Sequence, residues 1–244
     1  MHTVRNNNRR QPEVTMHVPD GFLDAPTSVA TGVVAAGVVG ASLVRASRRE
    51  LDERTAPLAG LVAVFVFAAQ MVNFPVGAGT SGHLLGAALA AVLVGPATAT
   101  LCLAVVLAVQ AFLFADGGVT ALGTNVVLMG VVGVWVGYAV ARGVLALLPK
   151  RLASIPVAAS AGAFVSVPVA ALTFTGLYAV GGAAPIPLGT LAATMVGWHV
   201  LIGLGEAAIT FLAVTSIVAA RPDLVHVARG RMPALELRTP EPVA

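Results

Sequence analysis

The 244-residue chain has very few charged residues. Only 10% of its residues are Asp, Glu, Lys or Arg, whereas 57% are apolar, and its mean hydropathy is +0.90. A soluble domain carries about 25% charged residues, which help to give it a polar surface. So little charge cannot cover a globule in water. The composition therefore argues against an ordinary soluble domain and predicts that lipid surrounds most of the chain.

Other features that define common protein classes are also missing. The single cysteine, Cys102, lies in an apolar run, so the chain can form neither a disulfide framework nor a thiolate cluster. There is no His-Glu-x-x-His, Gly-x-Ser-x-Gly or phosphate-binding motif, and Gly-Ala-Gly at 77–79 has no lysine after it. ATP binding by this chain is therefore not expected. Nucleic acid is not an expected partner either, because the basic clusters are short and fall between apolar runs.

Seven apolar runs account for most of the sequence. A helix that crosses a bilayer needs about 20 mainly apolar residues. Such runs cover roughly 27–45, 56–72, 82–95, 97–115, 124–147, 153–180 and 189–219. They predict an all-α, polytopic membrane protein with about seven transmembrane helices in residues 16–220. A polar leader, 1–15, either precedes the true start or is disordered, and a solvated cytoplasmic tail occupies 221–244.

The basic residues indicate how the chain is oriented. They follow the first run, lie between the fifth and sixth, and follow the seventh: Arg45, Arg48, Arg49, Arg54, Arg142, Lys150, Arg151, Arg221, Arg229 and Arg231. The segments after the second, fourth and sixth runs contain no Lys or Arg. Cytoplasmic loops of membrane proteins are enriched in these residues. The pattern therefore predicts an N-terminus outside and a C-terminus in the cytoplasm.

Two of the five histidines, His17 and His83, are predicted to lie outside, near the membrane surface. If translation begins at Met16, the amine of Met16 and the amide and ring nitrogens of His17 can close fused chelate rings on one cation. A nitrogen of His83 would then complete a square plane, which suits Ni(II) or Cu(II) and suits Mg²⁺ poorly. We therefore expect a metal site at Met16, His17 and His83.

Five further polar residues are candidates to support this site: Asn73, Ser81, Asn125, His199 and Glu206. The two asparagines stand at outer helix ends, where they could cap helices or hydrogen-bond the metal ligands. His199 and Glu206 are seven residues apart and therefore share a helix face. Ionisable groups at membrane depth are costly to bury unpaired. These two residues either form a hydrogen-bonded pair of polar residues that holds helices together or serve the function directly.

A stripe of small residues runs along the first apolar run, with Ser28, Gly32, Ala36 and Gly40 at intervals of four. Gly133 and Gly137 form a shorter stripe. Small residues at this spacing allow another helix to approach closely within a membrane. The approaching helix can belong to this chain or to a partner membrane subunit, and the sequence is compatible with both.

Four motifs together resemble the CbiM/NikM family, the substrate-binding membrane components of energy-coupling factor importers for Co²⁺ and Ni²⁺. They are Met16-His-Val-Pro-Asp-Gly-Phe-Leu, Asn73-Phe-Pro-Val-Gly-Ala-Gly-Thr-Ser-Gly-His-Leu-Leu-Gly, Gly118-Val-Thr-Ala-Leu-Gly-Thr-Asn and His199-Val-Leu-Ile-Gly-Leu-Gly-Glu. The resemblance covers residues 16 to 220. It implies that the Met16 amine, His17 and His83 bind the metal. The leader, 1–15, departs from the family pattern, because it would remove that free amine.

The resemblance also implies the setting in which the chain works. It implies a multi-pass protein of the bacterial inner membrane with a transmembrane scaffold subunit, two ATP-binding subunits and a small accessory membrane subunit as partners. The metal would be the substrate, with no resident cofactor and no enzymatic activity in this chain, and would supply cobalamin synthesis or nickel enzymes. Two other hypotheses stay open: a membrane metalloenzyme, and a metal-sensing or structural membrane subunit.

Overall fold

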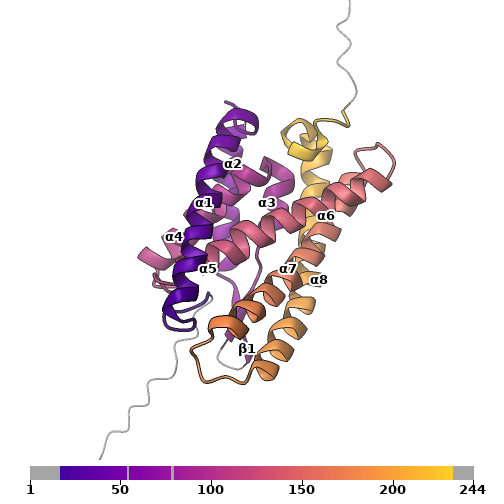
Figure 1. Ribbon diagram of the computed structural model, residues 1–244. Helices are drawn as coiled ribbons and strands as arrows, with labels where there is room; N and C mark the ends of the chain where they lie inside the picture. The colour runs from indigo at the N-terminus through magenta and orange to yellow at the C-terminus, as the bar shows by residue number, and fades with distance from the viewer. Residues whose placement is uncertain (1–16, 54, 78–79, 233–244) are drawn as a thin grey trace, which may run out of the picture.

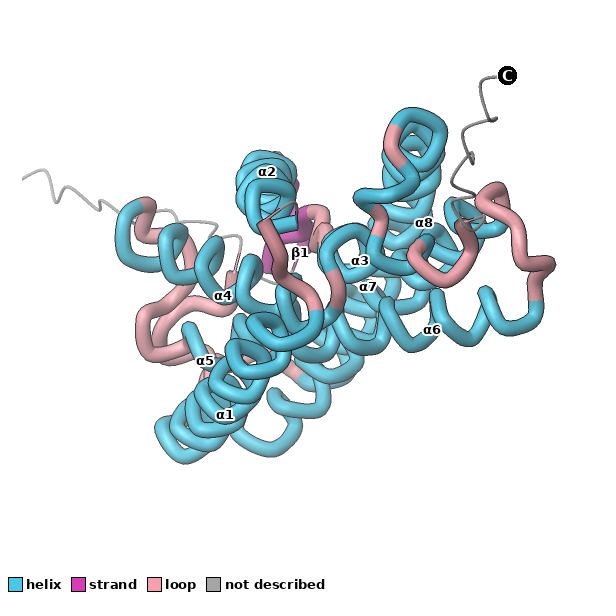
Figure 2. The backbone as a smooth tube through the Cα atoms, turned by 90° about the horizontal axis from the view of Figure 1, so that it is seen from above, coloured by secondary structure: helices cyan, strands magenta, loops and turns pink. Residues whose placement is uncertain are grey.

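The computed structural model describes residues 17–53, 55–77 and 80–232, and for residues 73–77, 80 and 81 it describes the backbone alone. This part of the chain is mainly helical (Figures 1 and 2). Its elements are α1 (Ala25–Arg49), α2 (Thr55–Gln70), β1 (Asn73–Gly77), β2 (Thr80–His83), α3 (Ala87–Val94), α4 (Pro96–Leu113), α5 (Leu122–Asn125), the π-helix η1 (Val126–Gly133), α6 (Val134–Leu147), α7 (Ser154–Gly181), α8 (Leu188–Ala220) and the 3-10 turns η2 (Pro222–Leu224) and η3 (His226–Ala228).

Five helices in the described part are long and apolar enough to cross a bilayer: α1, α4, the continuous helix Leu122–Leu147, α7 and α8. α2 is shorter, with 16 residues, and α3 has only eight. Each of the seven apolar runs thus contains a helix, which confirms the prediction of an all-α polytopic membrane protein. The run at 82–95 differs from expectation, because it is helical only from Ala87. Its first residues pair with β1 instead, in an antiparallel hairpin that joins the backbones of Asn73 and His83.

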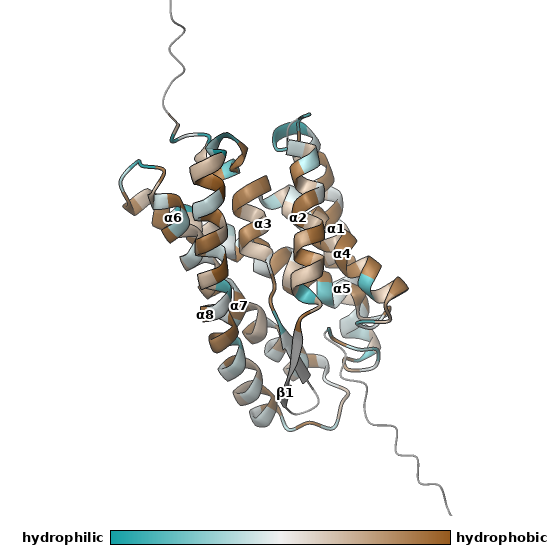
Figure 3. Cartoon of the chain, turned by 180° about the vertical axis from the view of Figure 1, so that it is seen from behind, coloured by the Kyte–Doolittle hydropathy of each residue, from teal (hydrophilic) through white to brown (hydrophobic). Residues whose placement is uncertain are grey.

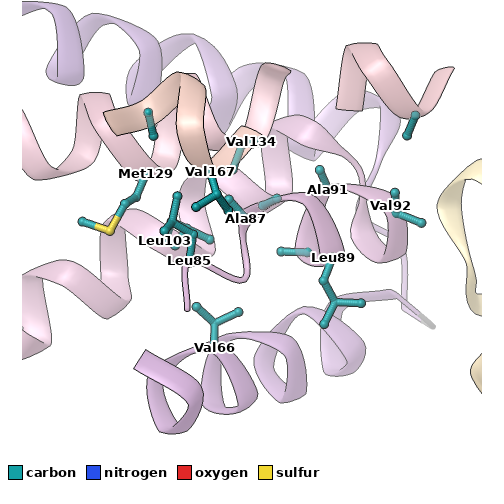
Figure 4. Close-up of a cluster of buried hydrophobic side chains, with 14 of the residues drawn as sticks. Val66, Leu85, Ala87, Leu89, Ala91, Val92, Leu103, Met129, Val134 and Val167 are labelled. Atoms are coloured by element: carbon teal, nitrogen blue, oxygen red, sulfur yellow. The ribbon is translucent and has the colours of Figure 1, made fainter. Parts of the chain in front are cut away.

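The short helix α3 lies inside the molecule. All eight of its residues are buried, and it packs against α4, α6 and α7. Figure 4 shows its apolar side chains in one cluster with Val66 of α2, Leu103 of α4 and Val167 of α7. The alanines in its sequence, Ala-Ala-Leu-Ala-Ala-Val-Leu-Val, allow this close approach. A buried apolar helix and a lipid-facing one have similar compositions, so hydropathy alone did not separate them.

The described chain begins at one end of the molecule and finishes at the opposite end (Figure 1). The basic clusters meet at the end where α1 stops, which is the hydrophilic upper end in Figure 3. There Arg231 donates hydrogen bonds to the carbonyl oxygens of Leu145 and Pro149, and Arg229 lies 4.0 Å from Asp52. The β1–β2 hairpin extends toward the other end. The basic loops and the hairpin therefore occupy opposite ends of the protein.

The residues that follow α8 differ from the solvated tail that the sequence predicts. Val225, Val227 and Ala228 are buried, and η3 packs against α3. The apolar pairs Leu224–Val225 and Val227–Ala228 let this segment fold back onto the bundle. The first part of the tail thus packs on the bundle at the basic end of the molecule.

The stripe of small residues on α1 is only partly used for packing within the chain. Gly32 lies against α5, where a Cβ added to Gly123 would be 2.4 Å from the Cα of Gly32. Ala36 and Gly40 are exposed. The buried face of α1 instead carries Thr27, Thr31, Ala35, Ser42 and Ala46. Packing within the chain therefore does not account for the stripe beyond Gly32.

Candidate metal centre

Two histidines that are far apart in the sequence lie together in the structure. The ring centroids of His17 and His83 are 4.7 Å apart, with an angle of 61° between the ring planes. Both side chains are buried. One comes from the segment before α1 and the other from the end of β2. Two neighbouring imidazoles supply two nitrogen donors of the kind that nickel, copper and zinc accept.

The ring of His83 is oriented by its own backbone. Its Nδ1 lies 2.9 Å from the carbonyl oxygen of Leu84, so Nδ1–H donates and Nε2 keeps its lone pair. Metal-binding histidines commonly donate their second nitrogen in this way, which fixes the tautomer. Burial, and then the neighbouring His17, lower the pKa of His83 to about 3. The imidazole is therefore neutral near pH 7, and no proton competes with a metal for it.

The ring of His17 contacts a carboxylate that was not among the predicted site residues. Nδ1 of His17 lies 3.1 Å from Oδ2 of Asp116, and both side chains are buried. Asp116 follows α4, in the Gly-rich loop between α4 and α5. A chelate ring formed by the amide nitrogen of His17 and its own imidazole must close through Nδ1, which is nearer to the backbone than Nε2. Asp116 thus contacts Nδ1, the ring atom of His17 through which the predicted amine chelate would bind the metal.

Asn125 binds the backbone next to His17. The amide N–H of Val18 donates to Oδ1 of Asn125 at 3.0 Å, and Nδ2 of Asn125 donates to the carbonyl oxygen of Val18 at 3.2 Å. The N–H of Gly118 donates to the same carbonyl oxygen at 2.9 Å. Of the two roles left open for Asn125, the structure places it beside the expected ligand rather than at a helix cap.

Two glycines of the α4–α5 loop allow the N-terminal segment to lie this close. Gly117 has a φ of +85°, and a Cβ at this position would lie 2.8 Å from Cβ of His17. A Cβ on Gly118 would lie 2.3 Å from the backbone nitrogen of Asp20. The side chain of Asp20 accepts hydrogen bonds from the hydroxyl and the N–H of Thr120, which lower the pKa of Asp20. Any larger residue at 117 or 118 would push the segment that carries His17 out of place.

The loop between α7 and α8 holds the other side of the same segment. The N–H of Asp24 donates to the carbonyl oxygen of Gly181 at 2.7 Å, and the N–H of Ala183 donates to that of Phe22 at 3.0 Å. The ring of Phe22 packs against Tyr178, with centroids 5.4 Å apart. Residues 17–24 therefore lie between two loops at one end of the molecule. No side-chain pattern in the sequence predicts these backbone contacts.

His199 and Glu206 share the buried face of α8, as their spacing predicts. They do not form the hydrogen-bonded pair that was one of the two open interpretations. His199 Nδ1 contacts the carbonyl oxygen of Met195 at 2.7 Å. The carboxylate of Glu206 accepts the N–H groups of Leu85 at 2.7 Å and Gly86 at 3.0 Å. Glu206 thus reaches the backbone just after His83.

The structure does not describe the side chains of three candidate residues. Met16 and the side chains of Asn73 and Ser81 lie outside the described part of the structure. Within residues 17–53, 55–77 and 80–232, no group of three or more His, Cys, Asp or Glu side chains is arranged to hold a metal ion. The described contribution to a metal site is thus the pair of imidazoles, with Asp116 and Asn125 behind His17.

The fold and this pair of histidines define a class: a multi-pass membrane protein in which the N-terminal segment and the end of β2 bring two nitrogen donors together. The family described as "Cobalt uptake substrate-specific transmembrane region" (CbiM) matches residues 17–224. The chain belongs to the CbiM family, as its four motifs indicate.

Individual relatives agree with this assignment. The chain is 35% identical over 231 residues to the fused nickel transport protein NikMN of Rhodobacter capsulatus, covering 90% of this chain and 66% of that protein. It is 39% identical over 210 residues to a Haloquadratum walsbyi protein whose name assigns it provisionally to metal transport, covering 86% and 93%. A crystal structure of a truncated transition metal transporter superposes with a TM-score of 0.75 and 30% identity, covering 84% of this chain and 99% of that one.

Proposed function

We propose that this protein is the substrate-binding membrane component of an ATP-driven importer of the energy-coupling factor type, and that it captures Co²⁺ or Ni²⁺ on the outer face of the membrane. The observation that carries the proposal is the pair of buried imidazoles, 4.7 Å apart, beneath the N-terminal segment of a CbiM-family chain. The family name concerns cobalt uptake, and the NikMN relative is named for nickel. Both ions accept nitrogen ligands.

The proposed ligands are the amine of Met16, the amide and ring nitrogens of His17, and the ring of His83. The orientation of His83, with Nδ1 bound to the Leu84 carbonyl, supports its use of Nε2. Metal binding through Nδ1 of His17 would displace Asp116 from that atom. The amine of Met16 and the amide of His17 must lose protons to bind, so binding releases protons to water. Asn125 would hold the backbone of Val18, next to His17, in place through its two hydrogen bonds.

The distribution of charge supports capture from outside. The basic loops lie at the end opposite the hairpin, and cytoplasmic loops are those enriched in Lys and Arg. Release to the cytoplasm then requires energy, and the sequence contains no nucleotide-binding motif. A transmembrane scaffold subunit, two ATP-binding subunits and a small accessory subunit would supply it. The exposed part of the α1 stripe, at Ala36 and Gly40, is available to a partner helix.

Metal accumulation in whole cells tests the transport function. Cells that produce this protein with its scaffold and ATP-binding partners should accumulate labelled Ni²⁺ or Co²⁺ well above cells that produce the partners alone. His83→Ala should return accumulation to the background, whereas Cys102→Ala, on α4, should not. Wild-type accumulation that needs no ATP-binding partner would contradict the importer type. A membrane metalloenzyme or a sensor would produce no accumulation with any partner.

Orientation can be tested by thiol labelling in a Cys102→Ala background. Ser47 and Lys150 are exposed at the basic end, while Val119 and Pro185 are exposed in the two loops that hold the N-terminal segment. Single cysteines at Val119 and Pro185 should react with an impermeant thiol reagent in intact cells. Cysteines at Ser47 and Lys150 should react only after the cells are opened. The reverse pattern would place the histidine pair on the cytoplasmic side and would contradict capture from outside.

A further inference from the structure

One peptide group connects a buried carboxylate to the metal-binding histidine. The carbonyl oxygen of Leu84 accepts the hydrogen bond from Nδ1 of His83, at 2.9 Å. The N–H of Leu85 belongs to that same peptide group and donates to Oε2 of Glu206, at 2.7 Å. A continuous chain of hydrogen bonds therefore runs from the carboxylate on α8, through one peptide, to the imidazole of His83.

A second peptide braces the first. The N–H of Gly86 donates to Oε1 of Glu206 at 3.0 Å, and the carbonyl oxygen of Leu85, in the same peptide, accepts Nε2–H of Gln70 at 2.9 Å. Both oxygens of Glu206 are thus engaged by successive backbone N–H groups, while Gln70 of α2 holds the opposite side. Two helices that are far apart in the sequence together fix the turn that leads from His83 into α3.

Burial makes these bonds strong and selective. Glu206 is 2% exposed, Leu85 3% and Gln70 0%, so water does not compete for them. Figure 4 shows Leu85 within the buried apolar cluster at the start of α3. A hydrogen bond in this low-dielectric interior is electrostatically stronger than the same bond in water. Donation of a peptide N–H to a carboxylate also polarises the peptide, which makes its carbonyl oxygen a better acceptor.

We propose that Glu206 and Gln70 are positioning residues that orient His83 for the metal through the Leu84–Leu85 and Leu85–Gly86 peptides. The inference rests on the proposed function, in which Nε2 of His83 binds the ion. Many metal sites have a carboxylate bound directly to the far nitrogen of a ligating histidine, which fixes the tautomer and raises the basicity of the ligand. Here one peptide group stands between the carboxylate and the imidazole and conveys both effects.

The chain provides a matched control for Glu206. Glu50, at the end of α1, is also a buried carboxylate that accepts two backbone N–H groups at the start of a helix, those of Ala97 at 3.3 Å and Thr98 at 2.7 Å. It lies at the basic end of the molecule, where α1 stops, away from His83. Glu206→Gln and Glu50→Gln both disturb a carboxylate that accepts two backbone N–H groups, and Glu50→Gln also removes the ion pair with Arg45 at 3.5 Å. Only Glu206 is connected to the metal ligand.

The test measures binding of Ni²⁺ and Co²⁺ chloride to the purified full-length protein, together with the visible absorption spectrum of the Ni²⁺ complex and the thermal unfolding of the metal-free protein. Glu206→Gln should weaken metal binding by about 10- to 100-fold, the usual cost of losing a partner of a metal-binding histidine, and should shift the Ni²⁺ absorption band. Glu50→Gln should lower thermal stability to a similar degree and leave both the affinity and the band unchanged. Gln70→Met, which keeps the side-chain volume, should weaken binding in the same direction by less.

Three results would overturn the inference: wild-type affinity in Glu206→Gln, equal losses of affinity in Glu206→Gln and Glu50→Gln, or unchanged affinity in Gln70→Met. The last of these decides the matter if Glu206→Gln does not fold. Failure of the proposed function gives a different result, because His83→Ala would then bind Ni²⁺ as tightly as the wild-type protein. The two failures are therefore distinguishable in one set of titrations.

Discussion

Insertion of one glycine between Met16 and His17 is expected to abolish tight metal binding by a form of this protein that begins at Met16. The amine, the amide and the ring of a second-position histidine can bind one cation only when the first residue is adjacent. The insertion breaks this chelate. Affinity should fall by more than about 100-fold, because even the loss of a group behind a ligand costs 10- to 100-fold. Calorimetric titration with Ni²⁺ measures the change.

Two controls accompany this experiment. The same insertion between Lys150 and Arg151, at the basic end, should leave the affinity unchanged. Asp116→Asn then separates two modes of binding. If the cation takes Nδ1 of His17, as the amine chelate requires, Asp116 competes for that atom and its loss should not weaken binding. If His17 binds through Nε2, Asp116 orients the ring, and Asp116→Asn should weaken binding.

A form that retains residues 1–15 should bind weakly if the chelate is correct. Tight binding by that form, with dependence on His17, would show that side chains alone hold the ion. Mass spectrometry of the protein from its native host identifies the residue at which the chain begins.

Replacement of either histidine by alanine is the second change with a large expected effect. His17→Ala removes the ring that anchors the chelate, and His83→Ala removes the nitrogen that completes the plane. Each should lower Ni²⁺ affinity by at least about 100-fold, since each removes a direct ligand and not a group behind one. The loss should be smaller for His83→Ala, because a water molecule can occupy the vacant position. Titration of the purified variants gives both values.

His226→Ala is the control for these substitutions, since His226 lies in η3 at the basic end. Its affinity for Ni²⁺ should match that of the wild-type protein. A wild-type affinity in either His17→Ala or His83→Ala would instead exclude that ring as a ligand.

Much of this architecture could be predicted because lipid selects for simple patterns. Runs of apolar residues revealed the helices, and short basic clusters indicated which loops share an end. The two histidines could be brought together because the predicted topology places both at the same end. α3 was predicted from its hydropathy as a transmembrane helix, but it is buried in protein. Hydropathy measures how a segment avoids water, and it does not distinguish burial in lipid from burial in protein.

The polar contacts of the site were harder to predict for a related reason. The spacing of His199 and Glu206 gave their common face correctly, but not their partners, since Glu206 binds backbone N–H groups rather than another side chain. Every residue has such groups, so no side-chain pattern identifies the ones that are used. Asp116 carried a weak signal, as an acidic residue in a Gly-rich loop that the sequence predicts at the outer helix ends. Its contact with His17 depends on how the N-terminal segment lies between two loops.

The shortness of α3 has a consequence for the environment of the ion. Eight helical residues rise about 12 Å, whereas the hydrocarbon layer is about 30 Å thick. α3 therefore cannot cross that layer by itself, so the backbone from β2 to α3 must be enclosed by protein wherever it enters the layer, as irregular backbone at membrane depth requires. His83, which is 7% exposed, lies on this backbone. Acyl chains cannot reach it, so the chemistry of the ligand is insulated from the lipid composition of the membrane around it.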